Sequence, residues 1–153
     1  MKVAFDTSVL VAGSVARHVH EARARTWFEA AREGKFEAIT TTHALAETWA
    51  TLTAIPVEPR IAPAIVERVI ERLVRYIKPI ALRWDDYKSA MQRCGERGLR
   101  SGTVYDALHY VNAARQDADL FLTFNTRHFI PLATDDGPRI VAPPDPPGLL
   151  DDK

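Results

Sequence analysis

The chain has 153 residues, of which 46% are apolar and 26% are charged, and its 20 basic and 20 acidic side chains cancel at pH 7. This composition is typical of one compact globular domain and excludes a disordered chain. A net charge of zero also argues against a general nucleic-acid coat protein, because such proteins carry a basic excess. Any polyanion must therefore be bound at a local site.

Cysteine content and hydropathy indicate a cellular compartment. Cys94 is the only cysteine and has no partner for an internal disulfide, and no secretory leader is recognisable, so we expect a reducing cytoplasm. Asp6 interrupts the apolar run at the N-terminus, and no apolar stretch reaches the roughly 18 residues that a membrane span requires. The sequence therefore disfavours export and membrane insertion.

Short apolar runs alternate with amphipathic segments along the whole chain. We expect strands at residues 2–5, 36–40, 77–82, 119–123 and 140–142, and helices at 18–32, 42–55, 63–74, 84–94 and 103–116, with a turn into helix at 9–12. Pro79 favours an edge position for its strand. This alternation predicts an α/β fold: a three-layer α/β/α domain with a central parallel sheet of four to five short strands.

Apolar spacing within two helices predicts which faces are buried. Leu45, Trp49 and Leu52 recur at helical spacing, and so do Trp84, Tyr87, Met91 and Cys94, so we expect both sets to pack inward. We assign residues 1–142 to a single domain. Four of the ten prolines lie at 143–147, so residues 143–153 are expected to form an extended, poorly ordered tail.

Four polar residues are expected at or near the carboxyl ends of the strands, where open parallel sheets bind ligands. Asp6 follows the first strand, Glu47 lies in the helix after the second, Asp106 opens a later helix and Asn125 follows the 119–123 strand. Three carboxylates in one pocket repel one another, and a divalent cation is the usual compensation. Oxygen ligands without Cys or His favour Mg²⁺ or Mn²⁺ over zinc.

Each of these residues also has a purely structural interpretation. Asp6 is a suitable cap for a following helix, and Glu47 lies opposite the Leu45 stripe, where a solvated side chain is expected. Thr103 and Asp106 have the spacing of a capping box, and Asn125 suits a turn. Sequence alone leaves these alternatives open.

Other chemistries find little support. The five histidines lack zinc-ligand spacing, no G-x-S-x-G elbow or glycine-rich phosphate loop is present, and Cys94 is on a face predicted to be packed. Ser8 also stands where aspartyl-phosphate phosphatases need a second aspartate. Covalent catalysis and zinc chemistry are thus disfavoured.

Four segments hold these polar residues: FDTSVLVA at 5–12, THALAETWATLT at 42–53, GTVYDALHYVNAA at 102–114 and LTFNTRHF at 122–129. In this order and at this spacing they resemble the PIN-domain ribonucleases, in particular the VapC-type toxins of bacterial and archaeal toxin–antitoxin pairs. The resemblance covers nearly the whole chain except the C-terminal tail.

The resemblance implies that Asp6, Glu47 and Asp106 coordinate Mg²⁺, with Mn²⁺ as a substitute, and that Ser8 supports the metal or a water. Asn125 stands where many family members have a fourth aspartate. Its neutral amide brings no charge for a second cation, so we expect one well-held metal.

The implied activity is hydrolysis of an RNA phosphodiester by metal-activated water. Arg100, Arg127 and His128 lie near the site in sequence and are candidates for phosphate contacts. The resemblance also implies two partners: an antitoxin that covers the acidic groove and a second copy in a homodimer. The alternatives are a PIN nuclease that acts in RNA processing and a PIN-like binding module with weak or no catalysis.

Overall fold

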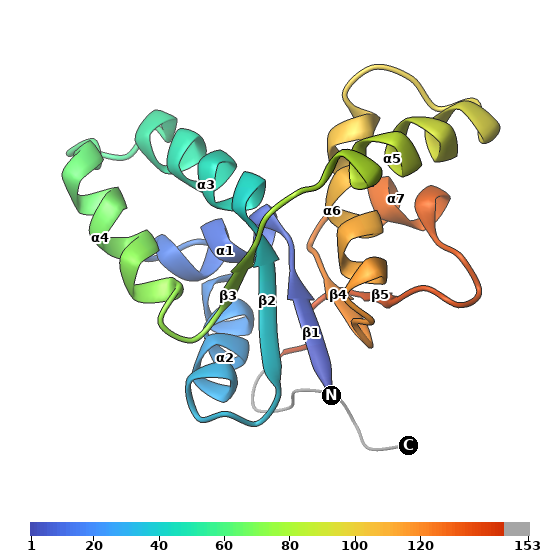
Figure 1. Cartoon of the computed structure of the whole chain (residues 1–153). Helices are drawn as coiled ribbons and strands as arrows, with labels where there is room; N and C mark the ends of the chain where they lie inside the picture. Colours follow the sequence, from blue (N-terminus) through green and yellow to red (C-terminus); the bar gives the residue numbers. More distant parts are fainter. Residues whose placement is uncertain (146–153) are drawn as a thin grey trace.

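The computed structural model describes residues 1–145 and contains one sheet of five parallel strands. The strands are β1 (Lys2–Phe5), β2 (Glu37–Thr41), β3 (Lys78–Ile80), β4 (Leu120–Leu122) and β5 (Arg139–Val141). Their order across the sheet is β3-β2-β1-β4-β5 (Figure 1), so Pro79 lies in an edge strand as predicted. The predicted α/β class and parallel sheet are confirmed.

Helices cover both faces of this sheet. They are α1 (Thr7–Ser14), α2 (Glu21–Arg32), α3 (Thr42–Ala54), α4 (Pro63–Leu73), α5 (Trp84–Glu96), α6 (Thr103–Arg115) and α7 (Thr126–Phe129), followed by a short 3-10 helix, η1 (Ile130–Leu132). The first four lie together on one side in Figure 1, and α5, α6 and α7 lie on the other. The three-layer arrangement follows from this distribution.

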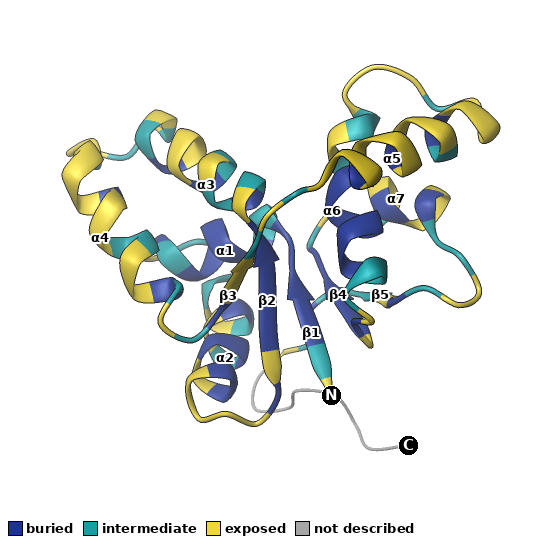
Figure 2. Ribbon diagram, viewed as in Figure 1, coloured by how far each residue is buried: buried dark blue, intermediate teal, exposed yellow. Residues whose placement is uncertain are grey.

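The core has two halves, one on each face of the sheet, because side chains along the strands point alternately to the two faces. Val3 and Phe5 of β1 pack with Trp27 of α2 on one face, whereas Ala4 points to the other face and packs with Phe121 of β4 and the buried residues of α6. Side chains of successive strand residues point to opposite faces, so each strand supplies both halves of the core. The central strands are buried throughout most of their length (Figure 2).

The predicted inner face of α3 is partly wrong. The buried residues of α3 are Ala44, Thr48 and Leu52, and Trp49 remains 39% exposed. Thr48 is tolerated inside because its hydroxyl donates to the Ala44 carbonyl at 2.7 Å, which leaves no polar group unsatisfied. The small side chains of Ala44 and Thr48 let α3 pack closely against the rest of its layer.

The predicted inner face of α5 is wrong for three of its four residues. Trp84, Tyr87 and Met91 are exposed, and of the predicted set only Cys94 is buried. The buried face instead includes Asp86, which forms an ion pair with Arg115 of α6 at 2.7 Å. A buried carboxylate with a partner 29 residues away overrides the apolar pattern of the helix.

Of the predicted C-terminal tail, residues 143–145 are described. Pro143 is buried and its carbonyl accepts a hydrogen bond from Arg23 Nε at 2.5 Å, so residue 143 is attached to α2. Residues 146–153 of the predicted tail lie outside the described residues. Within residues 1–145, no helix combines the length and apolar character needed to cross a membrane.

Candidate functional site

The sheet register brings Asp6 next to Thr123 at the carboxyl edge of the sheet. Phe5 of β1 pairs with Leu122 of β4, so the residues that follow them, Asp6 and Thr123, are neighbours. The Asp6 backbone N–H extends this pairing by donating to the Leu122 carbonyl at 2.9 Å. Asp6 is the N-cap of α1 and its Oδ2 accepts from the Ser8 N–H at 3.3 Å. The capping interpretation is therefore confirmed, and it coexists with further contacts.

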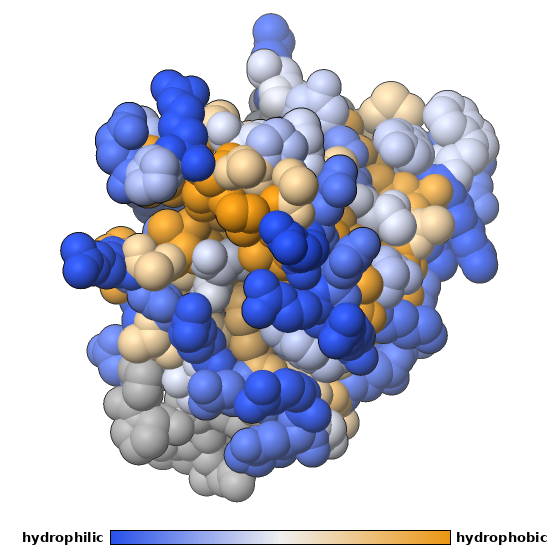
Figure 3. All heavy atoms as spheres, turned by 90° about the vertical axis from the view of Figure 1, so that its left-hand side faces the viewer, coloured by the Kyte–Doolittle hydropathy of each residue, from blue (hydrophilic) through white to orange (hydrophobic). Residues whose placement is uncertain are grey.

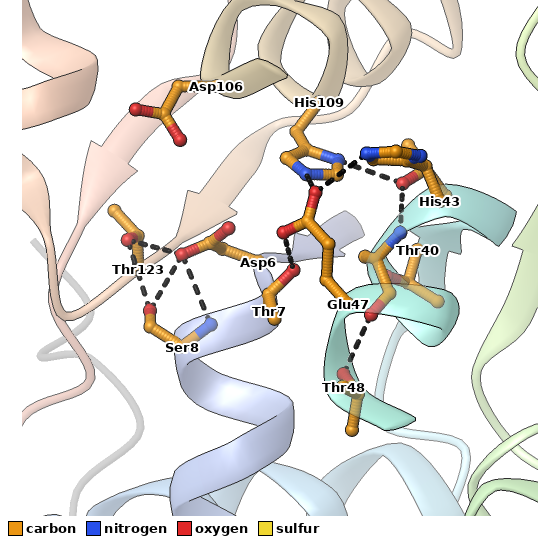
Figure 4. A network of polar contacts seen from close by, with 12 residues as sticks. Asp6, Thr7, Ser8, Thr40, His43, Glu47, Thr48, Asp106, His109 and Thr123 are labelled. Carbon is orange, nitrogen blue, oxygen red and sulfur yellow. Dashed lines mark hydrogen bonds and ion pairs between the residues drawn. The ribbon is translucent and has the colours of Figure 1, made fainter. Parts of the chain in front are cut away.

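Three donors converge on one oxygen of the Asp6 carboxylate, which is only 3% exposed. Besides the Ser8 N–H, the hydroxyls of Ser8 and Thr123 donate to Oδ2 at 2.7 and 2.8 Å (Figure 4). Within residues 1–145 no group donates to Oδ1. Thr123 was not predicted as a site residue, because it was placed within the expected strand 119–123, whereas β4 ends at Leu122 and leaves Thr123 at the carboxyl edge of the sheet. The hydrogen bonds thus fix the carboxylate and leave one oxygen available.

A second group of hydrogen bonds holds Glu47 of α3. Its Oε2 accepts from the Thr7 hydroxyl at 2.9 Å, and its Oε1 lies 2.9 Å from His43 Nε2 and 3.0 Å from His109 Nε2. Burial disfavours the Glu47 carboxylate, but the hydrogen bonds and charges of His109, Thr7 and His43 outweigh it and lower its pKa. The expectation of a solvated Glu47 is therefore wrong.

His109 of α6 is the buried residue that positions Glu47. The Glu47 carboxylate can only accept, so His109 Nε2 donates to it at 3.0 Å. On the other side of the ring, His109 Nδ1 lies 2.8 Å from the Thr41 hydroxyl, which accepts from the Ala44 N–H at 2.9 Å. The contacts of His109 with Thr41 and Glu47 were not predicted from the sequence, because these residues are far apart in the chain; Thr41 and His109 are separated by 68 positions.

Asp106 is the least supported carboxylate of the three. Helix α6 begins at Thr103 with Gly102 as its N-cap residue, and no side chain within residues 1–145 caps it, so the predicted capping box between Thr103 and Asp106 is not formed. Burial and the neighbouring charges of Asp6 and, more weakly, Glu47 raise the Asp106 pKa, against a smaller opposing effect of His128 and His109. Its ion pair with His128 Nδ1 is long, at 3.8 Å. In Figure 4 the carboxylates of Asp6 and Asp106 border the same space.

The remaining predicted residues lie at the periphery. Asn125 is exposed, and its backbone N–H donates to the Thr123 hydroxyl at 3.0 Å while its side chain has no hydrogen bond in the described part of the chain. Arg100 and Arg127 are exposed and form no ion pair with the three carboxylates among residues 1–145. The structure thus brings Ser8 to Asp6 and His128 to Asp106, with the charges of Asp6 and Glu47 acting on Asp106, and links Asn125 to the site through Thr123, whereas no described contact joins Arg100 or Arg127 to it.

The arrangement suits a divalent cation in donor chemistry but is not a closed metal cage. No three His, Cys, Asp or Glu side chains in the described region form a ready-made metal group. The available donors are nevertheless oxygens, namely Asp6 Oδ1 and the Asp106 carboxylate. Burial, and after it the charge of Asp6, raises the Asp106 pKa, and a cation in this space would favour the ionised form of Asp106.

A separate cavity of about 620 Å³ lies between α1, α2 and α4, away from the carboxylates. Its apolar wall includes Phe28, Val69 and Leu73, and four arginines surround it: Arg25, Arg32, Arg72 and Arg75. Figure 3 shows this side of the molecule, where apolar side chains gather at the centre and hydrophilic ones surround them. The molecule therefore presents a basic, partly apolar hollow in addition to its acidic site.

Comparison with known proteins establishes the family. The family model described as PIN domain matches residues 3–133. The chain is also 33% identical over 118 residues to Ribonuclease VapC27 of Mycobacterium tuberculosis, an alignment that covers 77% of this chain and 81% of that protein. The chain belongs to the PIN-domain family.

Solved structures agree with this fold. VapC20 of Mycobacterium tuberculosis, described as a sarcin-ricin loop cleaving toxin, has a TM-score of 0.66 at 20% identity and covers 89% of this chain and 99% of its own. VapBC2 of Rickettsia felis, bound to a DNA fragment from their promoter, has a TM-score of 0.67 at 13% identity, and the match covers 93% of this chain and 98% of that one. VapBC-1 of nontypeable Haemophilus influenzae has a TM-score of 0.64 at 15% identity, and the match covers 93% of this chain and 98% of that one. At these identities the likeness concerns the fold.

Proposed function

We propose that this chain is a metal-dependent endoribonuclease that hydrolyses RNA phosphodiester bonds, and that it is the toxin of a VapBC-type pair. One observation carries the proposal. Asp6 holds a buried carboxylate whose Oδ1 receives no donor from residues 1–145, beside Asp106, whose pKa is raised by burial and by the charge of Asp6. The family and the similarity to Ribonuclease VapC27 support the same activity.

Asp6, Glu47 and Asp106 are the residues that would hold Mg²⁺, and Mn²⁺ suits the same oxygen donors. Bound there, Mg²⁺ supplies positive charge to phosphate oxygens and makes a water more acidic. Because Asn125 offers a neutral amide in place of a carboxylate, the proposal includes one tightly held cation.

Around this centre each residue has a distinct task under the proposal. Ser8 and Thr123 hold Oδ2 of Asp6, so that Oδ1 stays directed into the site. His109 and Thr7 keep Glu47 ionised and oriented. The Asn125 amide orients a water at the edge of the site.

Three cationic or titratable side chains are proposed to contact the RNA backbone. His128 lies 3.8 Å from Asp106, so a phosphate at the carboxylates is within its reach. Arg100 and Arg127 are exposed and have no carboxylate partner among residues 1–145, which leaves their guanidinium groups available for phosphates. These contacts position the strand and carry no sequence information.

An antitoxin is the first proposed protein partner. Similar solved structures include VapBC complexes, so we propose that a cognate antitoxin covers the acidic groove. The cavity between α2 and α4 would take acidic and apolar side chains of the same antitoxin, because arginines surround its apolar wall. Reversing charge with Arg72→Glu and Arg75→Glu should abolish rescue of growth by the antitoxin and leave toxicity intact. Unchanged rescue would reject this surface.

A second copy of the chain is the other proposed partner. Trp84, Tyr87 and Met91 form an exposed apolar row on α5, at the spacing of one helical face. Exposed rows of this kind are typical of protein interfaces. Light scattering should find a dimer for the wild type and a monomer for Trp84→Glu. Ile65→Glu, at an exposed apolar residue of α4, is the control that should stay dimeric.

The nuclease proposal is tested by incubating a mixed cellular RNA pool with the purified protein in Mg²⁺, in Mn²⁺ and in EDTA. We expect cleavage only with metal, and none by Asp6→Ala or Asp106→Asn variants that circular dichroism shows to be folded. Asp85→Asn is the control, because Asp85 is exposed on α5 and its partner is Lys88. Cleavage by both site variants would reject the mechanism. Absence of cleavage by the wild type would favour the binding module over the enzyme.

A further inference from the structure

Three aromatic rings lie in a row from the surface to the interior beside the carboxylates, the outer pair stacked and the inner pair tilted by 37°. The Tyr105 and His43 rings lie 6.1 Å apart with 21° between their planes, and the His43 and His109 rings lie 5.7 Å apart. Exposure falls along this row, from 56% for Tyr105 to 37% for the His43 side chain and 3% for His109. The outer end of the row is therefore an aromatic surface open to ligands.

Apart from the contact of its ring with His43, Tyr105 has no evident structural role within residues 1–145. Its hydroxyl has no hydrogen-bond partner within residues 1–145, and the residue does not belong to the apolar core. It precedes Asp106 in α6, so its backbone position is fixed by the same helix that supplies the third carboxylate. An exposed aromatic ring at such a position is free to bind a planar group.

His43 makes the outer surface rigid. Its Nε2 lies 2.9 Å from Glu47 Oε1, which in turn accepts from buried His109. The ring behind Tyr105 is thus held by the hydrogen bonds that position Glu47. A preorganised stacking surface loses little conformational entropy when a ligand binds.

We propose that Tyr105, supported by His43, stacks a nucleobase of the RNA strand adjacent to the phosphate that lies at the carboxylates; this inference rests on the proposed nuclease function. Single-stranded RNA is recognised mainly by unstacked bases that pack on aromatic side chains. A chain without net positive charge has little general attraction for RNA, so stacking would supply affinity that electrostatics does not. Tyr105 is a binding residue in this proposal, and His43 positions it.

The test uses 12-nucleotide RNAs that span a cleavage site found with the RNA pool. Binding is measured in EDTA by fluorescence anisotropy for the wild type, Tyr105→Phe and Tyr105→Ala, and KM and kcat are measured with Mg²⁺. We expect Tyr105→Ala to weaken binding about 10-fold and to raise KM with a smaller effect on kcat, and Tyr105→Phe to behave as the wild type. Ile65→Ala, at an exposed apolar residue of α4, should change neither quantity.

Abasic substitution separates stacking from other roles of the tyrosine. When the base that Tyr105 contacts is removed from the RNA, the wild type and Tyr105→Ala should bind equally. The same base replaced by 2-aminopurine should lose fluorescence on binding the wild type and Tyr105→Phe, and not on binding Tyr105→Ala. A Tyr105→Ala variant that binds normally, or whose defect persists with every abasic RNA, overturns the inference while cleavage by the wild type keeps the nuclease proposal. Absence of metal-dependent cleavage rejects both.

Discussion

The ion pair between α5 and α6 makes the strongest prediction about stability. Asp86 is 2% exposed and accepts four hydrogen bonds: from the Arg83 N–H at 2.8 Å, Asn112 Nδ2 at 3.2 Å, and Arg115 Nε and Nη2 at 2.7 and 2.9 Å. Removing one partner of a buried pair costs about 3–5 kcal/mol. Arg115 is 26% exposed and can regain water, so we take about 3 kcal/mol for Asp86→Ala.

Such a loss is large against a total stability of about 5–15 kcal/mol, and corresponds to a fall in Tm of about 6–12 °C. Urea unfolding followed by circular dichroism measures it. Asp85→Ala is the matched control, because Asp85 is 75% exposed and its pair with Lys88 is superficial, so it should cost less than about 1 kcal/mol.

Acid dependence provides a second check on the same pair. Burial disfavours the Asp86 carboxylate, but hydrogen bonds from Arg115, the Arg83 N–H and Asn112 outweigh it and lower its pKa. The stabilisation is therefore complete above the unfolded pKa of about 3.9 and is lost as the pH falls through the lower folded pKa. The difference between wild type and Asp86→Ala should shrink in that window. A loss below about 1 kcal/mol at pH 7, or one that does not change in acid, would refute the reasoning.

Three further predictions concern the site and the packing around it. Burial and the charge of Asp6 raise the Asp106 pKa, so wild-type stability without metal should rise as the pH falls from neutrality through that pKa, and Asp106→Asn should lack this rise in urea titrations. His109→Phe removes the donor that lowers the Glu47 pKa, so that pKa should rise in a carbon-13 NMR titration; an unchanged value would contradict the positioning role. A methyl group at Gly13 would collide with the Phe28 ring, so Gly13→Ala should cost about 1–3 kcal/mol in thermal unfolding, and a neutral result would show that the ring can move.

Local patterns in the sequence predicted the five strands and the six longer helices, but not the short helices α7 and η1. A buried run followed by a helix-capping aspartate predicts β1 and α1 correctly, because both signals involve adjacent residues. Pro63 at the first turn of α4 and Pro79 in an edge strand are likewise consequences of the proline ring itself. For most elements, the observed boundaries differ by a few residues from the predicted ones, because hydrogen bonding at the ends of an element depends on its neighbours.

Contacts between distant residues could not be predicted in the same way. The prediction of the inner face of α5 was wrong because Asp86 is buried against Arg115 of α6. Nothing in the sequence of α5 itself indicates this contact. Similarly, His109 was one of five histidines without a metal-binding spacing, and only Thr41 and Glu47 give it a role. Periodicity in the sequence shows how apolar a helix face is. Whether a polar residue can be buried depends instead on the hydrogen-bond or ionic partner that the fold brings to it.

The three carboxylates of the site are supported unequally, and this difference is itself an argument for a cation. Asp6 and Glu47 each have three protein donors within 3.3 Å, supplied by residues of α1, α3 and α6 and by Thr123. Among residues 1–145, the one cationic partner of Asp106 is His128 at 3.8 Å, although burial, Asp6 and Glu47 all disfavour the charge of Asp106. For stability alone an asparagine at this position would avoid the repulsion. An unrelieved carboxylate beside two fixed ones is instead the arrangement expected when the compensating charge comes from a bound ion.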